Sequence, residues 1–320
     1  MIKAIIFLIV GFLLLVKGAD FFVESASSIA KRLRIPSFVI GLTIVAFGTS
    51  APELAVSLSA ALKGSNDIAI GNVVGSNIFN ILVVLGASAA ISPIAVEKGL
   101  IKKDYPLSIF GVILLGLLSI DTFLFKSPSM KLGHIDGLIL LLVFAFFMYT
   151  TLREGFKKRA TTPQNDESNL PKWSIGTSII ILIVGLAGII LGGNLSVDGA
   201  KEIARALGLS EALIGLTIVA IGTSLPELVT SIVAARKDES DIAVGNVIGS
   251  NIFNIFFILG TSAAISPMNV TDSYLYDILV LLVISIVSFI PIAKTKKVNR
   301  SLGLIMLFAY VAYTAYLIMR

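Results

Sequence analysis

Long apolar runs separated by short polar connections make up nearly all of this 320-residue chain. A helix that crosses a bilayer needs about 20 consecutive, mostly apolar residues. Windows of that length predict an all-α polytopic membrane protein with ten spans, at 2–25, 36–62, 68–95, 104–121, 133–152, 173–196, 209–235, 242–267, 273–293 and 301–319.

Composition supports this interpretation and excludes several kinds of site. Hydrophobic residues make up 56% of the chain and charged residues 14%, which is typical of membrane proteins. There is no cysteine, and the one histidine, His134, lies in a short polar connection. A disulfide framework and a thiolate or imidazole metal site are therefore not expected, and we expect no cofactor. The first run has no small-residue cleavage site, so we expect a first span and not a removed signal peptide.

The net charge of +5 is distributed unevenly between the two sides of the predicted membrane. When connections are counted on alternate sides, seventeen basic residues lie on one side and seven on the other. Cytoplasmic loops carry the excess of Lys and Arg, so both termini are expected outside. The basic residues thus indicate topology and not nucleic-acid binding.

A long internal repeat divides the chain into two copies. Residues 41–93 recur from 215 at a constant offset of 174, with about seven positions in ten identical. Each copy holds five spans, and because five is odd the second copy is expected to be inverted in the membrane, as in many secondary transporters. The sequence therefore predicts a first five-helix repeat at 1–152, a cytoplasmic linker at 153–172 and a second, inverted five-helix repeat at 173–320.

Each copy carries a proline inside an otherwise apolar span, in "GTSAPEL" (48–54) and "GTSLPEL" (222–228). Pro52 and Pro226 lack an N–H and clash with the carbonyl four residues earlier, so the core helices are expected to be discontinuous. Carbonyls near Ala46 to Thr49, and near Ala220 to Thr223, would then lack helical partners, which is tolerated where backbone lines a cavity. The alternative is a simple kink whose carbonyls are satisfied by the neighbouring hydroxyls.

Glu53 and Glu227 lie near the middle of the second and seventh spans. An intramembrane carboxylate is costly and usually marks an ion pathway. Hydroxyls at helical spacings of three and four share the face of each glutamate: Thr49, Ser50 and Ser57 in the first copy, and Thr223, Ser224 and Ser231 in the second. The alternative is a pair of protonated glutamates that serve as structural hydrogen-bonding groups.

The next span of each copy contains a polar stripe, in "GNVVGSNIFN" (71–80) and "GNVIGSNIFN" (245–254). Its small residues favour close helix packing, and its amides can bond between helices. For Asn72, Asn77, Asn246 and Asn251 we leave packing and ligand roles equally open. Ser76, Asn80, Ser250 and Asn254 lie deeper and are the stronger ligand candidates.

All of these groups are hard oxygen donors, which suit Ca²⁺ and also Na⁺. Two glutamates supply a formal charge of −2, which one Ca²⁺ or several monovalent ions would neutralise. The sequence has no nucleotide-binding motif, so uphill transport would need an ion gradient. An intramembrane enzyme is disfavoured because the spans contain no cysteine, no histidine and no Gly-x-Gly-Asp pattern.

With these paired motifs the chain resembles the sodium/calcium exchanger family of the cation/calcium antiporter superfamily, in particular its small prokaryotic members. The resemblance implies exchange of three Na⁺ for one Ca²⁺ by alternating access, in a prokaryotic cytoplasmic membrane. It implies that the first and sixth spans slide across a core that holds four ion positions. The implied ligands are Glu53, Glu227, Thr49, Ser50, Thr223, Ser224, Ser76, Ser250, Asn80, Asn254 and the carbonyls of Ala46 and Ala220.

One position departs from part of the superfamily. Potassium-dependent relatives carry aspartate where this chain has Asn254, which disfavours potassium coupling. A Ca²⁺/H⁺ exchanger is the alternative within the class, and an ion channel that uses the same carboxylates is the alternative outside it. Ca²⁺, Na⁺ and the lipid bilayer are the expected partners, and the sequence indicates no protein partner.

Overall fold

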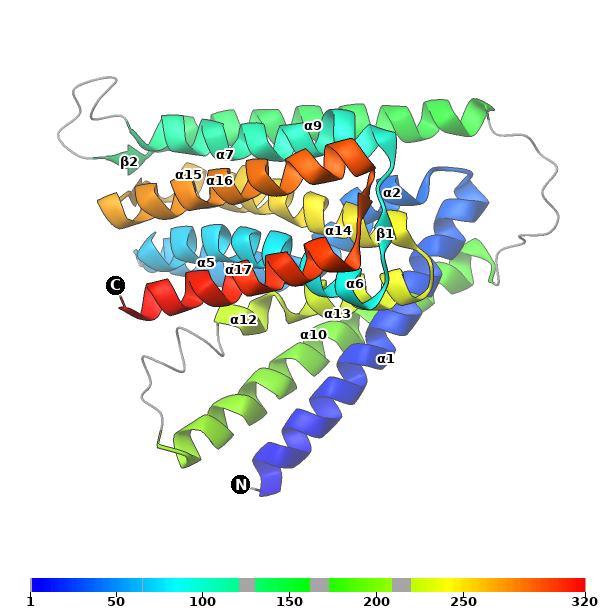
Figure 1. The fold of residues 1–320 in the computed structure, drawn as a ribbon, viewed down its shortest axis with the longest axis horizontal. Helices are drawn as coiled ribbons and strands as arrows, with labels where there is room; N and C mark the ends of the chain where they lie inside the picture. Colours follow the sequence, from blue (N-terminus) through cyan, green and yellow to red (C-terminus); the bar gives the residue numbers. More distant parts are fainter. Residues whose placement is uncertain (1, 65, 121–129, 162–172, 209–219, 320) are drawn as a thin grey trace.

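The structure is a computed structural model that describes residues 2–64, 66–120, 130–161, 173–208 and 220–319. Its elements are overwhelmingly helical, which confirms the all-α polytopic class (Figure 1). The helical elements of the first half are α1 (Ile2–Leu33), α2 (Ser37–Ile40), η1 (Gly41–Val45), α3 (Ala46–Thr49), α4 (Ala51–Leu62), α5 (Asn66–Phe79), η2 (Asn80–Leu85), α6 (Gly86–Ile91), η3 (Leu100–Asp104), α7 (Tyr105–Ser119) and α9 (His134–Thr161). Those of the second half are α10 (Ile175–Ala206), α12 (Ala220–Thr223), α13 (Leu225–Arg236), α14 (Ser240–Ile252), η6 (Phe253–Leu259), α15 (Gly260–Ile265), α16 (Asp272–Thr295) and α17 (Arg300–Met319).

Among the described residues, seven helices are long and apolar enough to cross a membrane, or eight if the bent pair 37–49 and 51–62 counts as one span. The fourth predicted span corresponds to the 15-residue α7, which follows the π-helical η3. The seventh predicted span includes 209–219, which lie outside the described residues. The count of ten spans therefore stays a prediction.

Several helices are longer than their apolar runs. α1 and α10 each have 32 residues, whereas the predicted spans ended at 25 and 196. α9 continues to Thr161, past the predicted start of the linker at 153. The extensions carry charged residues together with small ones, and good helix formers such as Ala, Lys, Arg and Glu continue a helix beyond the apolar stretch. A hydropathy window does not detect this continuation.

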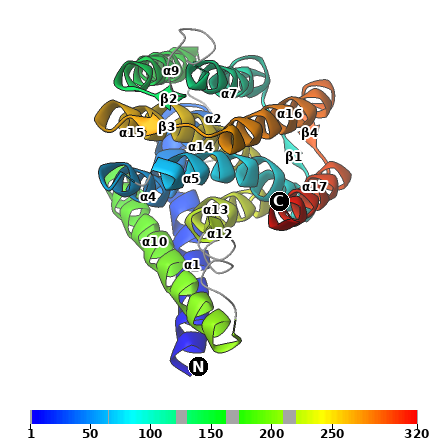
Figure 2. The same ribbon diagram turned by 90° about the vertical axis from the view of Figure 1, so that its left-hand side faces the viewer.

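The most enclosed spans lie at the centre of the molecule. In the segment Ser240–Ile265, which holds α14, η6 and α15, 94% of the apolar window is buried, and in Ile68–Ile91 the value is 72%. α7 and α9 lie along one face of this core, and α1 and α10 cross the opposite face obliquely (Figures 1 and 2). The two spans that carry the polar stripes are thus the most completely buried of the candidate spans.

α1 and α10 pack side by side with their backbones in close approach. A Cβ added at Gly11 would lie 2.5 Å from the Ser196 nitrogen, and one added at Gly192 would lie 2.5 Å from the Leu15 nitrogen. Small residues allow such backbone contact between membrane helices. As residue numbers rise along α1, their partners on α10 fall, so the two helices run antiparallel (Figure 2).

Two short antiparallel strand pairs join the halves at the ends of the core helices. β1 (Ile94–Ala95) pairs with β4 (Lys297–Val298), and β2 (Lys131–Leu132) pairs with β3 (Met268–Asn269). No strand was predicted, because two residues carry no alternating pattern that could be recognised. Each pair joins an element of the first half to an element of the second.

Candidate cation site

The proline motifs break their helices at a serine. α3 ends at Thr49, Ser50 has φ −82° and ψ 7°, and α4 begins at Ala51 with a bend of 50° between the two segments. In the second half Ser224, with φ −92° and ψ 6°, separates α12 from α13 in the same way. Proline is tolerated in the first turn of a helix because the N–H there has no intrahelical partner. The prediction of discontinuous core helices is confirmed at both motifs.

The break at each proline motif leaves fewer backbone carbonyls without helical partners than the sequence suggested. The expectation that the Ala46 carbonyl lacks a helical partner is wrong: it accepts the N–H of Ser50 at 3.0 Å. The missing N–H belongs to Pro52, two residues beyond Ser50, so this bond is preserved. In the second half the N–H of Ser224 bonds to the Ile221 carbonyl at 3.1 Å, which tightens the turn. A carbonyl oxygen that accepts one N–H keeps a second lone pair, so the assignments of the Ala46 and Ala220 carbonyls as ligands both stay predictions.

The two glutamates are buried and are each held by the other half of the chain. Glu53 and Glu227 are each 1% exposed and lie in the first turns of α4 and α13. The Ser224 hydroxyl donates to Oε1 of Glu53 at 3.0 Å, and the Ser50 hydroxyl donates to Oε1 of Glu227 at 2.9 Å. These crossed bonds bring both motifs into one site, and the helix N-termini favour the carboxylates electrostatically.

The deeper serines of the polar stripes belong to the same network. The hydroxyls of Ser76 and Ser224 lie 3.1 Å apart, and because the Ser224 proton is donated to Glu53, Ser76 is the donor of this pair. The Ser250 hydroxyl lies 3.4 Å from Oε1 of Glu227, to which it donates. Ser76 and Ser250 are both buried. Both predicted serines therefore lie in direct contact with the crossed pairs.

The threonines connect the motifs to the asparagines of the stripes. Thr49 donates to Oδ1 of Asn246 at 3.1 Å, and Thr223 donates to Oδ1 of Asn72 at 3.4 Å. Asn246 in turn donates to Ser231, and Asn72 to Ser57, each at 3.0 Å. Thr49, Thr223, Asn72 and Asn246 thus link the halves of the chain around the glutamates.

A second crossed layer lies one helical turn further along, at the start of the π-helical segments η2 and η6. Asn80 donates to Oδ1 of Asn251 at 3.1 Å, and Asn254 donates to Oδ1 of Asn77 at 2.9 Å. π-helical turns are rare and often mark functional sites. The side chains of Asn77 and Asn251 form contacts between the two halves of the chain, which supports the packing interpretation for this pair.

Four buried oxygens in these two layers have no hydrogen-bond partner: Oε2 of Glu53, Oε2 of Glu227, Oδ1 of Asn80 and Oδ1 of Asn254. They form two pairs related by the repeat offset of 174. A buried polar atom without a partner is costly, and carboxylate and amide oxygens are ligands for hard cations. The described residues contain no group of three or more His, Cys, Asp and Glu side chains, so any cation here relies on neutral oxygens beside the two carboxylates.

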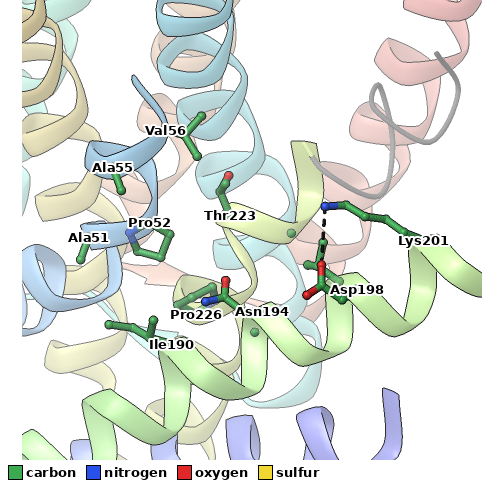
Figure 3. Close-up of a pocket in the computed structure, with 13 residues that line it drawn as sticks. Ala51, Pro52, Ala55, Val56, Ile190, Asn194, Asp198, Lys201, Thr223 and Pro226 are labelled. Atoms are coloured by element: carbon green, nitrogen blue, oxygen red, sulfur yellow. Dashed lines mark ion pairs between the residues drawn. The ribbon is translucent and has the colours of Figure 1, made fainter. Parts of the chain in front are cut away.

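A cavity of about 550 Å³ reaches the motifs from one side. Pro52 and Pro226 line it, and Thr223 lies beside them, as Figure 3 shows. α10 supplies its other wall, where Asp198 and Lys201 form an ion pair of 3.8 Å within the cavity lining. The cavity therefore connects the surface of the molecule with the broken helices.

On the opposite side α1 is tied to the connection between α13 and α14. Lys237 lies 3.2 Å from Asp20 and 3.6 Å from Glu24, and Lys31 lies 3.6 Å from Glu239. Ser27 also donates to Glu239. These ion pairs were not predicted, because the basic residues near span ends were interpreted first as topology markers and second as lipid contacts. The internal repeat could have indicated that these charges are functional, because at the offset of 174 Glu24 matches Asp198 and Lys63 matches Lys237.

Known proteins match both halves of this chain. The family model described as sodium/calcium exchanger protein matches residues 3–153 and again 177–319. The putative antiporter CaxA of Alkalimonas amylolytica is 42% identical, and the alignment covers 98% of each chain. The sodium/calcium exchanger MaX1 of Methanosarcina acetivorans is 35% identical over 96% of each chain.

A solved structure of the sodium-calcium exchanger NCX_Mj is also similar throughout. It superposes with a TM-score of 0.84 at 37% identity, and 98% of each chain is covered. Full-length matches in both sequence and structure place the chain among secondary transporters and not among enzymes. The chain belongs to the sodium/calcium exchanger family.

Proposed function

We propose that this protein exchanges Na⁺ for Ca²⁺ across the membrane, with both ions bound between Glu53 and Glu227. The observation that carries the proposal is the pair of crossed glutamate–serine bonds together with the unpartnered Oε2 atom of each carboxylate. The two carboxylates come from different halves of the chain, so a cation between them would contact both halves at once.

The charge of the site favours competition between the two ions. Two carboxylates balance one Ca²⁺, which takes six to eight oxygens in flexible geometry. The hydroxyls of Ser50, Ser224, Ser76 and Ser250 and the amide oxygens of Asn80 and Asn254 supply neutral donors for either ion. Ca²⁺ and Na⁺ would use overlapping ligands, so binding of one would exclude the other.

The access cavity and the opposite ion pairs suggest one state of an alternating-access cycle. The cavity lies at the Lys201 end of α10, on the side predicted to face outward. The Lys237 bonds to Asp20 and Glu24 lie on the side predicted to be cytoplasmic. In our proposal this conformation admits ions from outside and is closed toward the cytoplasm.

The repeat suggests how the opposite state is closed. Lys63, the counterpart of Lys237, is exposed and makes no ion pair in the described part of the chain, while Asp198 is the counterpart of Glu24. Sliding of α1 and α10 would release Lys237 from Glu24 and bring Lys63 onto Asp198. The same chemistry would then close the outer side.

The antiparallel packing of α1 and α10 supports an inverted repeat. The two helices occupy equivalent positions in the two copies, since Gly11 and Gly18 match Gly185 and Gly192 at the offset of 174. Equivalent helices that run in opposite directions are what an inverted duplication requires. We therefore retain ten spans in a prokaryotic cytoplasmic membrane, with both termini outside and the 153–172 linker in the cytoplasm.

The test is ⁴⁵Ca²⁺ uptake into proteoliposomes under an outward gradient of Na⁺, K⁺ or protons. We expect uptake that follows the Na⁺ gradient alone. Uptake driven by protons without Na⁺ would assign the chain to Ca²⁺/H⁺ exchange, and a requirement for K⁺ would assign potassium-dependent exchange. Ca²⁺ flux without any counter-ion requirement, accompanied by single-channel currents, would identify a channel.

A further inference from the structure

A second hollow, lined almost entirely by hydrocarbon, lies on the outer surface of the core. It has a volume of about 450 Å³ and lies between α9 on one side and the segment from the end of α1 to α3 on the other, with η6 beneath. Thr43 is the one polar side chain in its lining, and its hydroxyl is already bonded to the Val39 carbonyl at 2.6 Å. The hollow therefore offers no free polar group to a ligand inside it.

Three cationic residues are direct sequence neighbours of residues that line one end of this groove. Arg34 lies between the lining residues Leu33 and Ile35, while Arg153 and Lys157 each directly follow a lining residue of α9. A Cβ at Gly155 would lie 3.3 Å from Val39, so α9 and α2 meet closely at this end. All three cations are exposed, and none forms an ion pair in the described part of the chain.

The main chain at Arg34 has a defined conformation that ends α1. It has a left-handed φ of 55°, and the following N–H, of Ile35, bonds back to the Ala30 carbonyl at 3.0 Å. This geometry ends α1 and would suit glycine or asparagine better than arginine. An arginine at such a position is consistent with a role for its side chain.

The length of the groove matches one leaflet of a bilayer. Its lining on α9 runs from Phe144 to Phe156, which is about 18 Å at 1.5 Å per residue. Half of the hydrocarbon core of a bilayer is about 15 Å. The cationic end would lie at the membrane surface and the Phe144 end near the midplane.

The inner end of the groove consists of aromatic rings that adjoin the cation site. Phe144 lies 4.8 Å from Phe253 between ring centroids, and Phe47 lies 5.6 Å from Phe253. Phe253 directly precedes Asn254, and Phe47 directly follows Ala46. An occupant of the groove would therefore contact side chains whose sequence neighbours are two of the candidate ligands.

We propose that this groove binds one acyl chain of an anionic phospholipid, whose phosphate contacts Arg34, Arg153 and Lys157. The charge at one end, the apolar lining and the depth of a single leaflet all fit this ligand, and basic pockets between membrane helices are known sites for anionic head groups. A zwitterionic lipid would fill the groove without matching the three cations. The proposal concerns lipid binding and does not depend on which ions the protein exchanges.

The test uses delipidated, purified protein titrated with phosphatidylglycerol or phosphatidylcholine and examined by native mass spectrometry. We expect one phosphatidylglycerol to be retained selectively. In the triple variant Arg34→Asn, Arg153→Gln, Lys157→Gln the apparent affinity for phosphatidylglycerol should fall about 100-fold. Each cation near an anionic head group contributes about fivefold in affinity, and three are removed. The matched control Lys98→Gln, Lys294→Gln, Lys297→Gln removes the same charge from the same predicted side and should retain the lipid.

A second pair of variants tests the groove itself. Ile44 lines it, and Ile44→Trp should prevent lipid retention by filling it, whereas Ile180→Trp on the exposed face of α10 should not. Excess glycerol phosphate should leave the lipid bound, because the groove holds the acyl chain. Equal loss in the two triple variants, retention by Ile44→Trp, or displacement by glycerol phosphate would each overturn the proposal.

Discussion

The hydroxyl of Ser224 donates a 3.0 Å hydrogen bond to the carboxylate of Glu53, a residue of the other copy of the repeat. The reciprocal bond, from Ser50 to Glu227, is 2.9 Å long. Neither copy can therefore complete the site alone, and each motif contributes a charge that the other motif orients. This reciprocity determines what substitutions in the site should do.

Glu53→Gln and Glu227→Gln should each abolish Ca²⁺ exchange while the protein still folds. Removing one partner of a buried charge pair costs about 3–5 kcal/mol, so Ca²⁺ should bind at least about 100-fold more weakly. Glu202→Gln, an exposed acid on α10, is the control and should exchange normally. ⁴⁵Ca²⁺ uptake and size-exclusion elution measure the two properties, and normal uptake by either glutamate variant would reject the assigned site.

Ser50→Ala and Ser224→Ala should weaken Ca²⁺ binding more mildly. A hydrogen bond to a charged group contributes about 1.5–3 kcal/mol, so a decrease of roughly 10- to 100-fold is expected, similar in the two variants because the bonds are reciprocal. Ser59→Ala, on the exposed face of α4, should leave affinity unchanged. Isothermal titration calorimetry gives the affinities; a loss in one serine variant without the other would argue against an equivalent role.

The ion pairs of Lys237 can be tested by cross-linking, because the chain has no native cysteine. Glu24→Cys with Lys237→Cys should react with a short bifunctional thiol reagent in the conformation described here, and the reaction should stop exchange. Lys63→Cys with Asp198→Cys should react only when conditions turn the site toward the cytoplasm. Glu24→Cys with Lys63→Cys is the control and should not react. Continued exchange by protein cross-linked at Glu24 and Lys237 would exclude gating at this position.

The close contact of α1 with α10 predicts a graded effect on stability. A Cβ at Gly192 would meet the backbone of α1 at 2.5 Å, so Gly192→Ala should destabilise the protein by about 1–3 kcal/mol through overpacking. On the same helix a Cβ at Gly176 would meet nothing within 4 Å, and Gly176→Ala should leave the melting temperature unchanged or raise it slightly. Thermal unfolding in detergent compares the two variants. Equal melting temperatures would show that a methyl group at position 192 is accommodated and that the close contact does not contribute to stability.

The sequence indicated the candidate site because its motifs are local and occur twice. Pro52 and Glu53 conflict with the membrane environment, and their recurrence as Pro226 and Glu227 indicated a two-part site that the crossed bonds now join. Their partners were harder to predict. Whether Lys237 reaches Asp20 depends on how α1 meets the distant connection between α13 and α14. The Ala46 carbonyl keeps its partner because the N–H that Pro52 lacks would have bonded to the Gly48 carbonyl, two residues further along.

The strand pairs β1–β4 and β2–β3 have a consequence for biosynthesis. β1 is synthesised early, but its partner β4 lies just before the last helix. The backbone hydrogen bonds of β1 to β4 therefore cannot form until translation is almost complete. Contacts between such distant segments form late because closing a long loop is entropically costly. A nascent chain without its final helices should therefore stay incompletely assembled, and removing them should expose the whole molecule, and not only its end, to quality-control proteolysis.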